Sequence, residues 1–348
     1  MARIVFLGLA ITSSWGNGHA TTYRGLVRAL ARRGHEVTFL ERDVPWYAAE
    51  RDLPAPPGCR TVLYRDLDAL FGHAGLLRRS DLAVLGSYVP DGVAVGEWLL
   101  AEAGGVRAFY DIDTPVTLAR LARGDDLYLA PHLVRGFDLY LSFTGGPTLA
   151  TLEREWGARM ARPLYCSVDP ELYFPENAPK RWDLGYMGTW SADRQPPLDA
   201  LLCAPAKAWP AGRFVVAGPQ YPPDLVWPPN VTRIEHVAPG GHRGFYNAQR
   251  FTLNLTRADM AAAGHSPSVR LFEAAACAVP IISDQWPGLE TLFTPGEEIV
   301  LAETPDQVLA ALRQLPEPRR RALGDAARRR VLAAHTCAHR AAELEVHA

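Results

Sequence analysis

Short apolar runs alternate along the chain with longer segments in which apolar positions recur with a helical period. The first half predicts strands at residues 3–9, 36–40, 81–85, 107–110 and 138–143, and a helix at 19–33 that Gly34 ends. The apolar runs are nearly continuous, which is typical of parallel strands covered on both faces. This alternation predicts an α/β domain built on a parallel sheet.

The alternation of strand and helix patterns is interrupted at residues 165–182, where YCSVDPELYFPENAPKRW carries three prolines and mixed charges. A second series follows, with strands predicted at 183–187, 213–217, 231–237, 251–255, 279–283 and 299–302, and helices at 196–202, 268–278, 305–315 and 318–335. The expected organisation is a doubly wound domain at 1–165, a linker at 166–182, a second doubly wound domain at 183–330 and a C-terminal helix at 331–348. Ligands of such domains bind beyond the carboxyl ends of the strands.

Composition narrows the class of protein. The 348 residues are 48% apolar and 21% charged, as in a globular protein, and the length suits two domains. A net charge of −2 gives no overall attraction to nucleic acid or to membranes. Five scattered cysteines without a C-x-x-C pair favour reduced thiols in a cytoplasm. No segment approaches the ~20 apolar residues that cross a bilayer, and the apolar run at 4–11 is predicted to be the first strand.

The segment SPSVRLFEA places one carboxylate, Glu273, in an apolar run that has the pattern of a helix. Ser266 and Ser268 predict the start of that helix, where free N–H groups and the dipole favour a phosphate. Arg270 in the first turn opposes the dipole, which a nearby anion would remedy. Two interpretations of Glu273 stay open, because it could accept hydrogen bonds from a ribose diol or form an ion pair with Arg257 or Arg270.

A second candidate loop, GYMGTWSADRQPP, follows a predicted strand. Gly188 allows the backbone to approach a ligand closely, and Arg194 offers the bidentate geometry that suits a phosphate. A surface loop with a solvated arginine is the alternative.

The first domain carries a glycine turn, Gly16-Asn17-Gly18, directly before His19 at the start of a predicted helix. With Glu41 further on, this turn partly resembles a dinucleotide-binding fingerprint, but the third glycine of that fingerprint is absent. His19 is interpreted either as a polar residue that begins the helix or as a group that faces the ligand.

Two aspartates, Asp111 and Asp113, end another predicted strand in FYDIDTPVTL. One interpretation is a general base or a hydroxyl binder, and the other is a helix N-cap at Asp113 or Thr114. His335 and His339 have the spacing of metal ligands, but the glutamate of an HExxH site is absent, so no metal site is predicted.

Together these segments resemble glycosyltransferases of the GT-B fold, in particular the spore-maturation-protein (CgeB-like) group, which is related to the retaining group 1 glycosyltransferases. The resemblance is carried by residues 266–302, 167–175, 184–194 and 335–345, and more weakly by GNGH and YDIDTP in the first half. It implies two Rossmann-like doubly wound domains that face a central cleft. It also implies no bound metal or other cofactor, and a UDP-, dTDP- or GDP-linked sugar as donor substrate.

The resemblance implies roles for individual residues on the donor side. Glu273 matches the glutamate that binds the nucleotide ribose, Arg194 matches the basic residue that faces the diphosphate, and the amides around residues 266–269 match a phosphate-binding helix start. Since fixed donors stabilise the charge of a leaving diphosphate, Arg194 and Arg270 are the expected catalytic cations on this side. The other residues expected on the donor side are Gly188, Thr189, Arg257, His265, Ser266, Ser268 and Val269, of which Arg257 has no assigned role.

On the acceptor side, Asp113 and His19 are expected to handle the acceptor proton or to bind acceptor hydroxyls. The loop residues expected beside them are Gly16, Asn17, Gly18 and Asp111.

One position departs from the resemblance. Many relatives carry a second glutamate eight positions before the one that Glu273 matches, and this chain has His265 there. The missing acid leaves the donor sugar open and weakens the expectation of retained stereochemistry, while a catalytic base at His19 would favour inversion.

The expected activity is transfer of a sugar to a hydroxyl of a small-molecule, glycan or lipid-linked acceptor in the cytoplasm. No nucleic acid or membrane span is expected, and peripheral contact with a membrane is left open. The alternatives are a nucleotide-sugar epimerase of the same fold, an NAD-dependent oxidoreductase that uses the turn at residues 16–18, and a non-catalytic nucleotide-sugar-binding protein.

Overall fold

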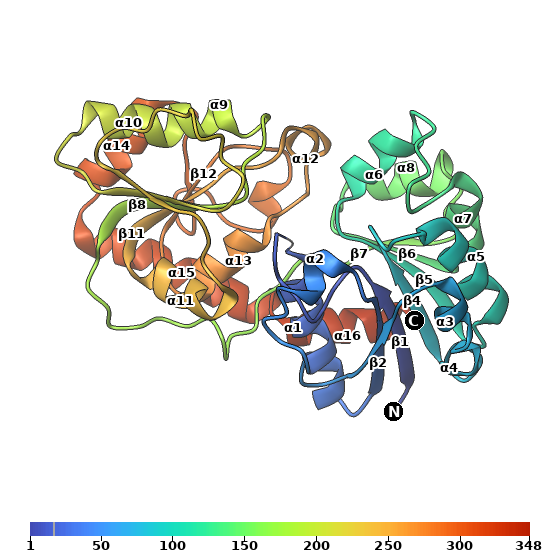
Figure 1. The fold of residues 1–348 in the computed structure, drawn as a ribbon. Coiled ribbons are helices and arrows are strands. Elements are labelled where there is room, and N and C mark those ends of the chain that lie inside the picture. Colours follow the sequence, from blue (N-terminus) through green and yellow to red (C-terminus); the bar gives the residue numbers. More distant parts are fainter. Residues whose placement is uncertain (17) are drawn as a thin grey trace. The chain divides into compact units, whose positions relative to one another are not determined.

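A computed structural model describes residues 1–16 and 18–348 (Figure 1). Asn17, an expected acceptor-side residue, lies outside the described residues. The chain forms two compact units, one of Met1–Cys166 with Cys337–Ala348 and the other of Ser167–Thr336. Each unit is built on its own parallel sheet, so the prediction of two parallel-sheet α/β domains is confirmed.

The first unit contains a seven-stranded sheet of order β3-β2-β1-β4-β5-β6-β7, in which every pair of neighbouring strands is parallel. Its strands are β1 (Arg3–Gly8), β2 (Glu36–Arg42), β3 (Arg60–Tyr64), β4 (Leu82–Gly86), β5 (Val106–Asp111), β6 (Leu139–Ser142) and β7 (Ala161–Pro163). Its helices are α1 (His19–Arg32), α2 (Pro45–Ala48), α3 (Leu67–Phe71), α4 (Ala74–Arg78), α5 (Gly92–Glu102), α6 (Thr114–Leu121), α7 (Pro131–Gly136), α8 (Pro147–Arg154) and α16 (Cys337–His347).

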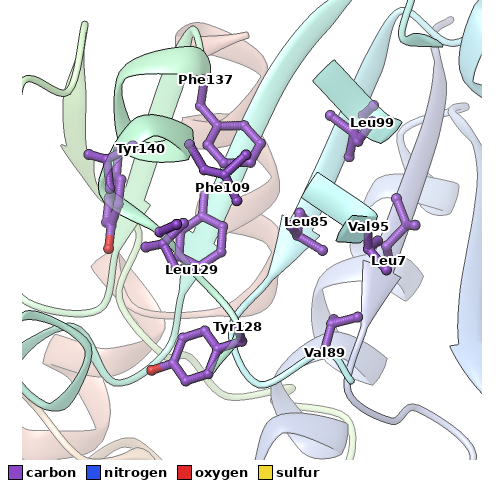
Figure 2. Packing of buried hydrophobic residues seen from close by; sticks show 14 of the residues in the cluster. Leu7, Leu85, Val89, Val95, Leu99, Phe109, Tyr128, Leu129, Phe137 and Tyr140 are labelled. Atoms are coloured by element: carbon purple, nitrogen blue, oxygen red, sulfur yellow. The ribbon is translucent and has the colours of Figure 1, made fainter. Parts of the chain in front are cut away.

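Both faces of this sheet are covered, which explains the continuous apolar runs in its sequence. Leu7 of β1 belongs to a core with Leu99 of α5 and with Phe137, which directly follows α7 (Figure 2). On the opposite face, Phe6 packs edge-on against Tyr23 of α1 with ring centroids 6.0 Å apart. Successive residues of one strand therefore serve two separate cores.

The second unit contains a six-stranded parallel sheet of order β10-β9-β8-β11-β12-β13. Its strands are β8 (Trp182–Met187), β9 (Phe214–Ala217), β10 (Val231–Ile234), β11 (Gln249–Asn254), β12 (Ile281–Ser283) and β13 (Val300–Leu301). Its helices are α9 (Gln195–Leu198), the π-helical turn η1 (Asp199–Cys203), α10 (Ala204–Ala208), α11 (Pro239–Asn247), α12 (Ala258–Ala263), α13 (Val269–Ala276), the 3-10 turn η2 (Leu289–Thr291), α14 (Pro305–Gln314) and α15 (Glu317–Ala334).

Helices α10 and α14 cover one face of the second sheet, and α13 and α15 cover the other (Figure 1). The strand order reverses between β8 and β11, which creates the switch point where a doubly wound sheet binds its ligand. The loops after these two strands are therefore the first place to look for a site.

Several elements differ from those predicted by sequence pattern. Strand β3 was not predicted, because it lies at the edge of its sheet and most of its residues are partly or fully exposed. The helix predicted at 196–202 is a continuous series, α9, η1 and α10, which continues past Pro205. The last helical segment breaks after Ala334, and α16 packs against α1 in the first unit.

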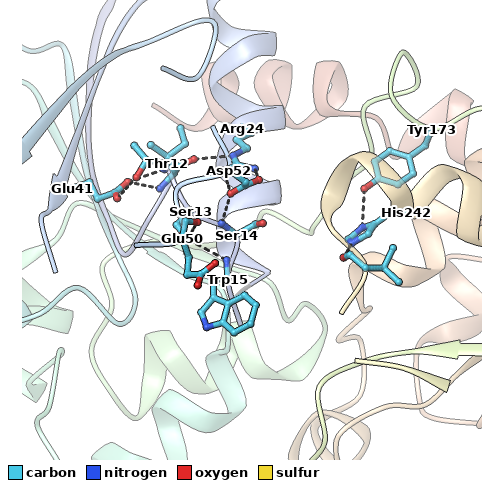
Figure 3. A network of polar contacts seen from close by, with 12 residues as sticks. Thr12, Ser13, Ser14, Trp15, Arg24, Glu41, Glu50, Asp52, Tyr173 and His242 are labelled. Carbon is cyan, nitrogen blue, oxygen red and sulfur yellow. Dashed lines mark hydrogen bonds and ion pairs between the residues drawn. The ribbon is translucent and has the colours of Figure 1, made fainter. Parts of the chain in front are cut away.

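The loop after β1 is fixed by a buried carboxylate at the end of β2. Glu41 is fully buried and accepts hydrogen bonds from the Ile11 N–H (2.6 Å), the Thr12 N–H (2.9 Å) and the Thr12 hydroxyl (2.5 Å) (Figure 3). In a dinucleotide-binding fingerprint the acid at this place binds a ribose hydroxyl. In this chain the Glu41 carboxylate is occupied by hydrogen bonds from the loop after β1. Glu41 instead holds the loop that leads into α1.

Glu41→Ala is expected to lower the free energy of unfolding of the first unit by about 2–4 kcal/mol, because buried N–H groups lose their acceptor. The matched control is Glu36→Ala at the exposed start of the same strand, which should change stability by less than about 0.5 kcal/mol. Hydrogen exchange of the β1 amides under native conditions measures both effects. Equal protection losses in the two variants would contradict the role of Glu41.

Candidate active site

A buried amide organises the carboxyl end of the second sheet. Asn254, the last residue of β11, is fully buried. Its Oδ1 accepts hydrogen bonds from the Ser268 hydroxyl (2.7 Å) and from Arg270 Nη1 (2.9 Å), and its Nδ2 donates to the Ser283 hydroxyl (3.0 Å). One side chain thereby ties β11 to β12 and to the start of α13.

Arg270 connects this hydrogen-bonded group around Asn254 to β8. Its guanidinium is buried, donates from Nε to the Met187 carbonyl (2.6 Å) and lies 4.8 Å from the centre of the Tyr186 ring. A side chain at Gly188 would meet Arg270 Nη2 at 3.0 Å, so the guanidinium lies directly beside the glycine loop. Arg270 thus links the two strands that flank the switch point, and its expected contact with a diphosphate stays a prediction.

The glycine loop after β8 depends on two glycines that approach each other. Gly218, at the end of the next strand, has a φ of +143°, and a side chain there would collide with the Gly188 carbonyl. Arg194 folds back over this loop, donating from Nη2 to the Thr189 carbonyl (2.6 Å) and from Nε to the Ser191 hydroxyl (2.9 Å). The loop therefore presents backbone groups close to a positively charged side chain.

Arg257 and Arg194 are brought together around one carboxylate. Burial by itself raises the pKa of Asp193, but the Ser191 hydroxyl, the Ala258 N–H (3.0 Å) and the charges of the two arginines lower it overall. Arg257 is the N-cap residue of α12 and is half-buried. Two of the expected donor-side cations therefore share one neighbour on adjacent loops.

The amino end of α13 lacks a side-chain cap. Ser268 occupies the N-cap position in an extended conformation, but its hydroxyl donates to Asn254, and no acidic residue lies in the first turn. Ser266 is buried and Val269 is half-buried. Because helix N-termini attract negative charge, this end of α13 suits a phosphate.

His265 stands where many relatives carry an acid, and its backbone is unusual. Its φ is +47°, a left-handed conformation that is uncommon for a residue other than glycine, and its N–H donates to the Pro287 carbonyl (2.6 Å). A side chain at Gly288 would collide with the His265 imidazole, so the ring packs flat against that glycine. The strained backbone fixes an imidazole just before α13.

Glu273, one turn into α13, is 3% exposed and is held by partners that sequence patterns did not reveal. The Tyr246 hydroxyl of α11 donates to Glu273 Oε2 (2.9 Å), and His242 Nδ1 of the same helix lies 3.9 Å from that oxygen. Arg270, one of the two cations considered as ion-pair partners, directs its hydrogen bonds to Met187 and Asn254. No local sequence signal joins α11 to α13, because the contacts form only in the folded unit.

In the first unit, His19 is the first residue of α1 and is 8% exposed. Its ring packs edge-on against Tyr88 at 5.4 Å, and its Nδ1 is buried without a hydrogen-bond partner among residues 1–16 and 18–348. Burial lowers the pKa of His19, and the Asp113 carboxylate offsets only part of that effect. The imidazole is therefore held neutral near a carboxylate, as a proton acceptor requires.

The two aspartates after β5 have different environments. Asp111 is fully buried and accepts hydrogen bonds from the Tyr140 hydroxyl (2.6 Å), the Thr117 hydroxyl (2.8 Å) and the Asp113 N–H (3.2 Å). Asp113 is half-buried at the N-cap position of α6, where its side chain makes no capping bond. The structure thus brings Asp113 near His19 and uses Asp111 to hold the strand end.

Two further acceptor-side residues, Gly16 and Gly18, lie before α1. Gly16 has a φ of +65°, and Gly18 precedes His19 at the N-cap position. Both glycines are exposed.

The two histidines near the chain end, His335 and His339, belong to different units. His335 follows the end of α15 and packs against Phe272 with ring centroids 4.9 Å apart, whereas His339 lies on α16 in the other unit. Within the described residues, no group of three or more His, Cys, Asp or Glu side chains is placed to hold a metal ion. Across residues 1–16 and 18–348, no helix is both long enough and apolar enough to span a membrane.

Comparisons with known proteins bear on this geometry. A family model described as "Glycosyl transferase-like" matches residues 194–345, a range that begins at Arg194 and includes Arg257 and all of α13. Sucrose-phosphate synthase from Thermosynechococcus elongatus superposes with a TM-score of 0.70 at 16% identity, over 99% of this chain and 98% of that chain. Anabaena Alr3699/HepE, solved with UDP-glucose, gives a TM-score of 0.72 at 13% identity over 99% of each chain.

The chain therefore has a GT-B fold, as expected. An alpha-glucosyltransferase solved with UDP and a 13-mer DNA also superposes, with a TM-score of 0.73 at 12% identity over 99% of each chain. No curated protein sequence gives a significant match. At these identities the structural likeness shows the fold alone.

The buried Asp111 carboxyl makes the stability of the first unit depend on pH. Burial raises its pKa from 3.8 to about 6, against the opposing effect of its hydrogen bonds from Tyr140 and Thr117. A carboxyl group whose pKa is higher in the folded state destabilises that state as pH rises from the unfolded to the folded pKa. Relative to Asp111→Asn, the wild type should lose about 3 kcal/mol of unfolding free energy between pH 3 and 7.

Urea unfolding of both proteins across this pH range measures the difference. Asp126→Asn, at an exposed position of the same unit, is the matched control and should show no such change. A constant difference between wild type and Asp111→Asn would show that Asp111 ionises normally.

Proposed function

We propose that the protein is a glycosyltransferase that moves a sugar from a nucleoside diphosphate sugar to an acceptor hydroxyl. The observation that carries this proposal is the edge of the second sheet, where the uncapped start of α13, Arg194 and the buried Glu273 occur together. The family match over residues 194–345 supports it. So do solved relatives of this fold that contain UDP-glucose or UDP.

On the donor side, Glu273 binds the ribose. A carboxylate offers about four lone-pair sites, and Tyr246 occupies one of them, which leaves room for two ribose hydroxyls. The amino end of α13 and Arg194 receive the diphosphate, whose negative charge grows as the glycosidic bond breaks. Fixed donors aimed at that charge stabilise the transition state more than the ground state.

On the acceptor side, His19 and Asp113 act on the hydroxyl that attacks the sugar. The pKa of His19 is lowered by burial, so the ring is neutral near pH 7 and can accept a proton. Retention is the proposed stereochemical outcome, on the resemblance to retaining group 1 enzymes. Inversion would instead make His19 the general base, and the anomeric configuration of the product distinguishes the two outcomes.

The finer assignments belong to the same proposal. The resemblance implies a hexosyl donor linked to UDP, dTDP or GDP, and a small-molecule, glycan or lipid-linked acceptor. It also implies membership of the CgeB-like group. A reducing, cytoplasmic setting is supported by five free cysteines, four of them buried. With a net charge of −2, the chain offers no general attraction for nucleic acid, although one relative of this fold is solved with DNA.

The proposal is tested by titrating the protein with UDP-, dTDP- and GDP-glucose in a calorimeter and by following each donor by NMR with and without acceptors. A transferase binds a donor and releases the diphosphate only when an acceptor or water takes the sugar. Conversion of the donor without an acceptor would instead identify an epimerase. Binding without any turnover would identify a binding protein.

Glu273→Ala should weaken binding of the preferred sugar nucleotide at least tenfold, because each hydrogen bond to a charged group contributes about 1.5–3 kcal/mol. If Glu273→Ala proves unstable, Glu273→Gln replaces it in the test, because it keeps the side-chain shape. Glu273→Gln should show the same loss of affinity. The matched control is Glu303→Ala, an exposed position of the same unit. Wild-type affinity in a folded Glu273→Gln protein would refute the ribose assignment.

Arg194→Ala should reduce turnover about a hundred- to a thousandfold, the usual cost of losing one fixed donor to a developing charge. Its melting temperature should stay close to that of the wild type, because within residues 1–16 and 18–348 the Arg194 side chain donates its hydrogen bonds to its own loop, to Thr189 and Ser191. Arg329→Ala, on the exposed face of α15, is the control for loss of one positive charge. Normal turnover in a donor-hydrolysis assay would remove Arg194 from the mechanism.

A further inference from the structure

The Glu273 carboxylate belongs to a small buried network that the proposed reaction does not explain. Besides the Tyr246 hydroxyl, two more polar groups surround it, the imidazole of His242 on α11 and the hydroxyl of Tyr173 in the segment before β8. Tyr173 is buried, and the side chain of His242 is 17% exposed. Figure 3 shows the Tyr173 hydroxyl directed at the His242 ring.

The hydrogen bonds fix which nitrogen of His242 can change its protonation. Nε2 lies 3.0 Å from the Val237 carbonyl, which can only accept, so this nitrogen carries a proton in every state. Nδ1 lies 3.3 Å from the Tyr173 hydroxyl and 3.9 Å from Glu273 Oε2. The titrating nitrogen therefore faces the carboxylate that is proposed to bind ribose.

Two arrangements of protons follow from this geometry. When His242 is neutral, Nδ1 accepts the Tyr173 O–H, and Glu273 keeps only the Tyr246 hydroxyl as a donor. When His242 is protonated, Nδ1–H donates to the Tyr173 oxygen, and the Tyr173 O–H turns to Glu273. The protonated state thus adds a hydroxyl donor and a positive charge to the carboxylate, and both compete with ribose hydroxyls for it.

We propose that His242 is a positioning residue whose protonation, relayed by Tyr173, controls how strongly Glu273 binds the donor. This inference rests on the proposed function, since it assumes that Glu273 is the ribose ligand. It deepens that function by making donor affinity proton-linked, with the neutral ring as the binding-competent state.

Among the groups around His242, Glu273 is the charged group that determines the protonation of its imidazole. Arg243, the next residue of α11, pairs with Glu176 at 2.6 Å. Burial raises the pKa of the Tyr173 and Tyr246 hydroxyls well above the ordinary value and that of the Cys277 thiol to about 12, so these groups are neutral.

Burial by itself lowers the pKa of His242, but the hydrogen bond and the charge of Glu273 outweigh burial and raise it. The sign of the pH dependence follows from this shift. Ribose hydroxyls replace the interaction of Glu273 with the protonated ring, so donor binding releases a proton from His242. Affinity should therefore rise with pH until the pH exceeds the raised pKa of His242.

The test is the dissociation constant of UDP-glucose and of GDP-glucose between pH 5.5 and 8.5, measured by calorimetry. Both probes carry a complete ribose diol, and neither has the terminal phosphate of a free diphosphate, which would titrate near pH ~6. Wild-type affinity should rise about tenfold across this range, the value of one charge-assisted hydrogen bond. His242→Gln should bind with almost no pH dependence, and Tyr173→Phe should show a reduced dependence.

His132→Gln, at an exposed position of the first unit, is the matched control and should keep the wild-type slope. A second readout is the His242 imidazole resonance, whose pKa should fall when UDP-glucose binds. The inference is overturned if His242→Gln keeps the wild-type slope, if affinity falls as pH rises, or if the ligand leaves the His242 pKa unchanged. If neither sugar nucleotide binds the folded wild type at any pH, the proposed function itself fails.

Discussion

The site depends on one buried hydrogen-bond centre, the Asn254 side chain and the Arg270 guanidinium that donates to it. A buried guanidinium must find fixed acceptors, because leaving it unsatisfied costs several kcal/mol. Arg270 finds them at the ends of β8 and β11, the two strands on either side of the switch point. This requirement fixes the start of α13 at the carboxyl edge of the sheet, and with it the helix end and Glu273 that the proposed donor contacts use.

The same chemistry of buried carboxylates serves two purposes in this chain. Glu41 accepts from two backbone N–H groups and a hydroxyl, and Asp111 accepts from two hydroxyls and an N–H, so each accepts three hydrogen bonds and holds the backbone around it in place. Glu273 accepts a hydrogen bond from the Tyr246 hydroxyl, and the His242 imidazole lies 3.9 Å from the same oxygen. Because an imidazole can lose its proton near neutral pH, we propose that Glu273, unlike Glu41 and Asp111, can exchange these interactions for a ligand.

Sequence patterns predicted the features that a few neighbouring residues determine. Continuous apolar runs located the central strands, and an acid inside such a run marked Glu273. The exposed edge strand β3 lacked that signal. The two aspartates Asp111 and Asp113 could not be told apart by spacing, because their difference arises from Tyr140 and Thr117 in the folded unit. Tyr173 and His242 were missed for the same reason, since their contacts with Glu273 join distant segments of the chain.

Two buried histidines show how partners decide the direction of a pKa shift. Burial dominates at His19, where the Asp113 charge is too weak to restore the usual pKa, whereas at His242 the adjacent Glu273 outweighs burial and raises the pKa. The proposed proton-linked donor binding needs a neutral His242, which frees Glu273 for the ribose, and a role of His19 as proton acceptor would need a neutral His19 as well. The group with the higher pKa sets the pH at which both conditions hold. We therefore expect weaker donor binding at Glu273, caused by protonation of His242, rather than protonation of His19, to limit the proposed reaction on the acid side.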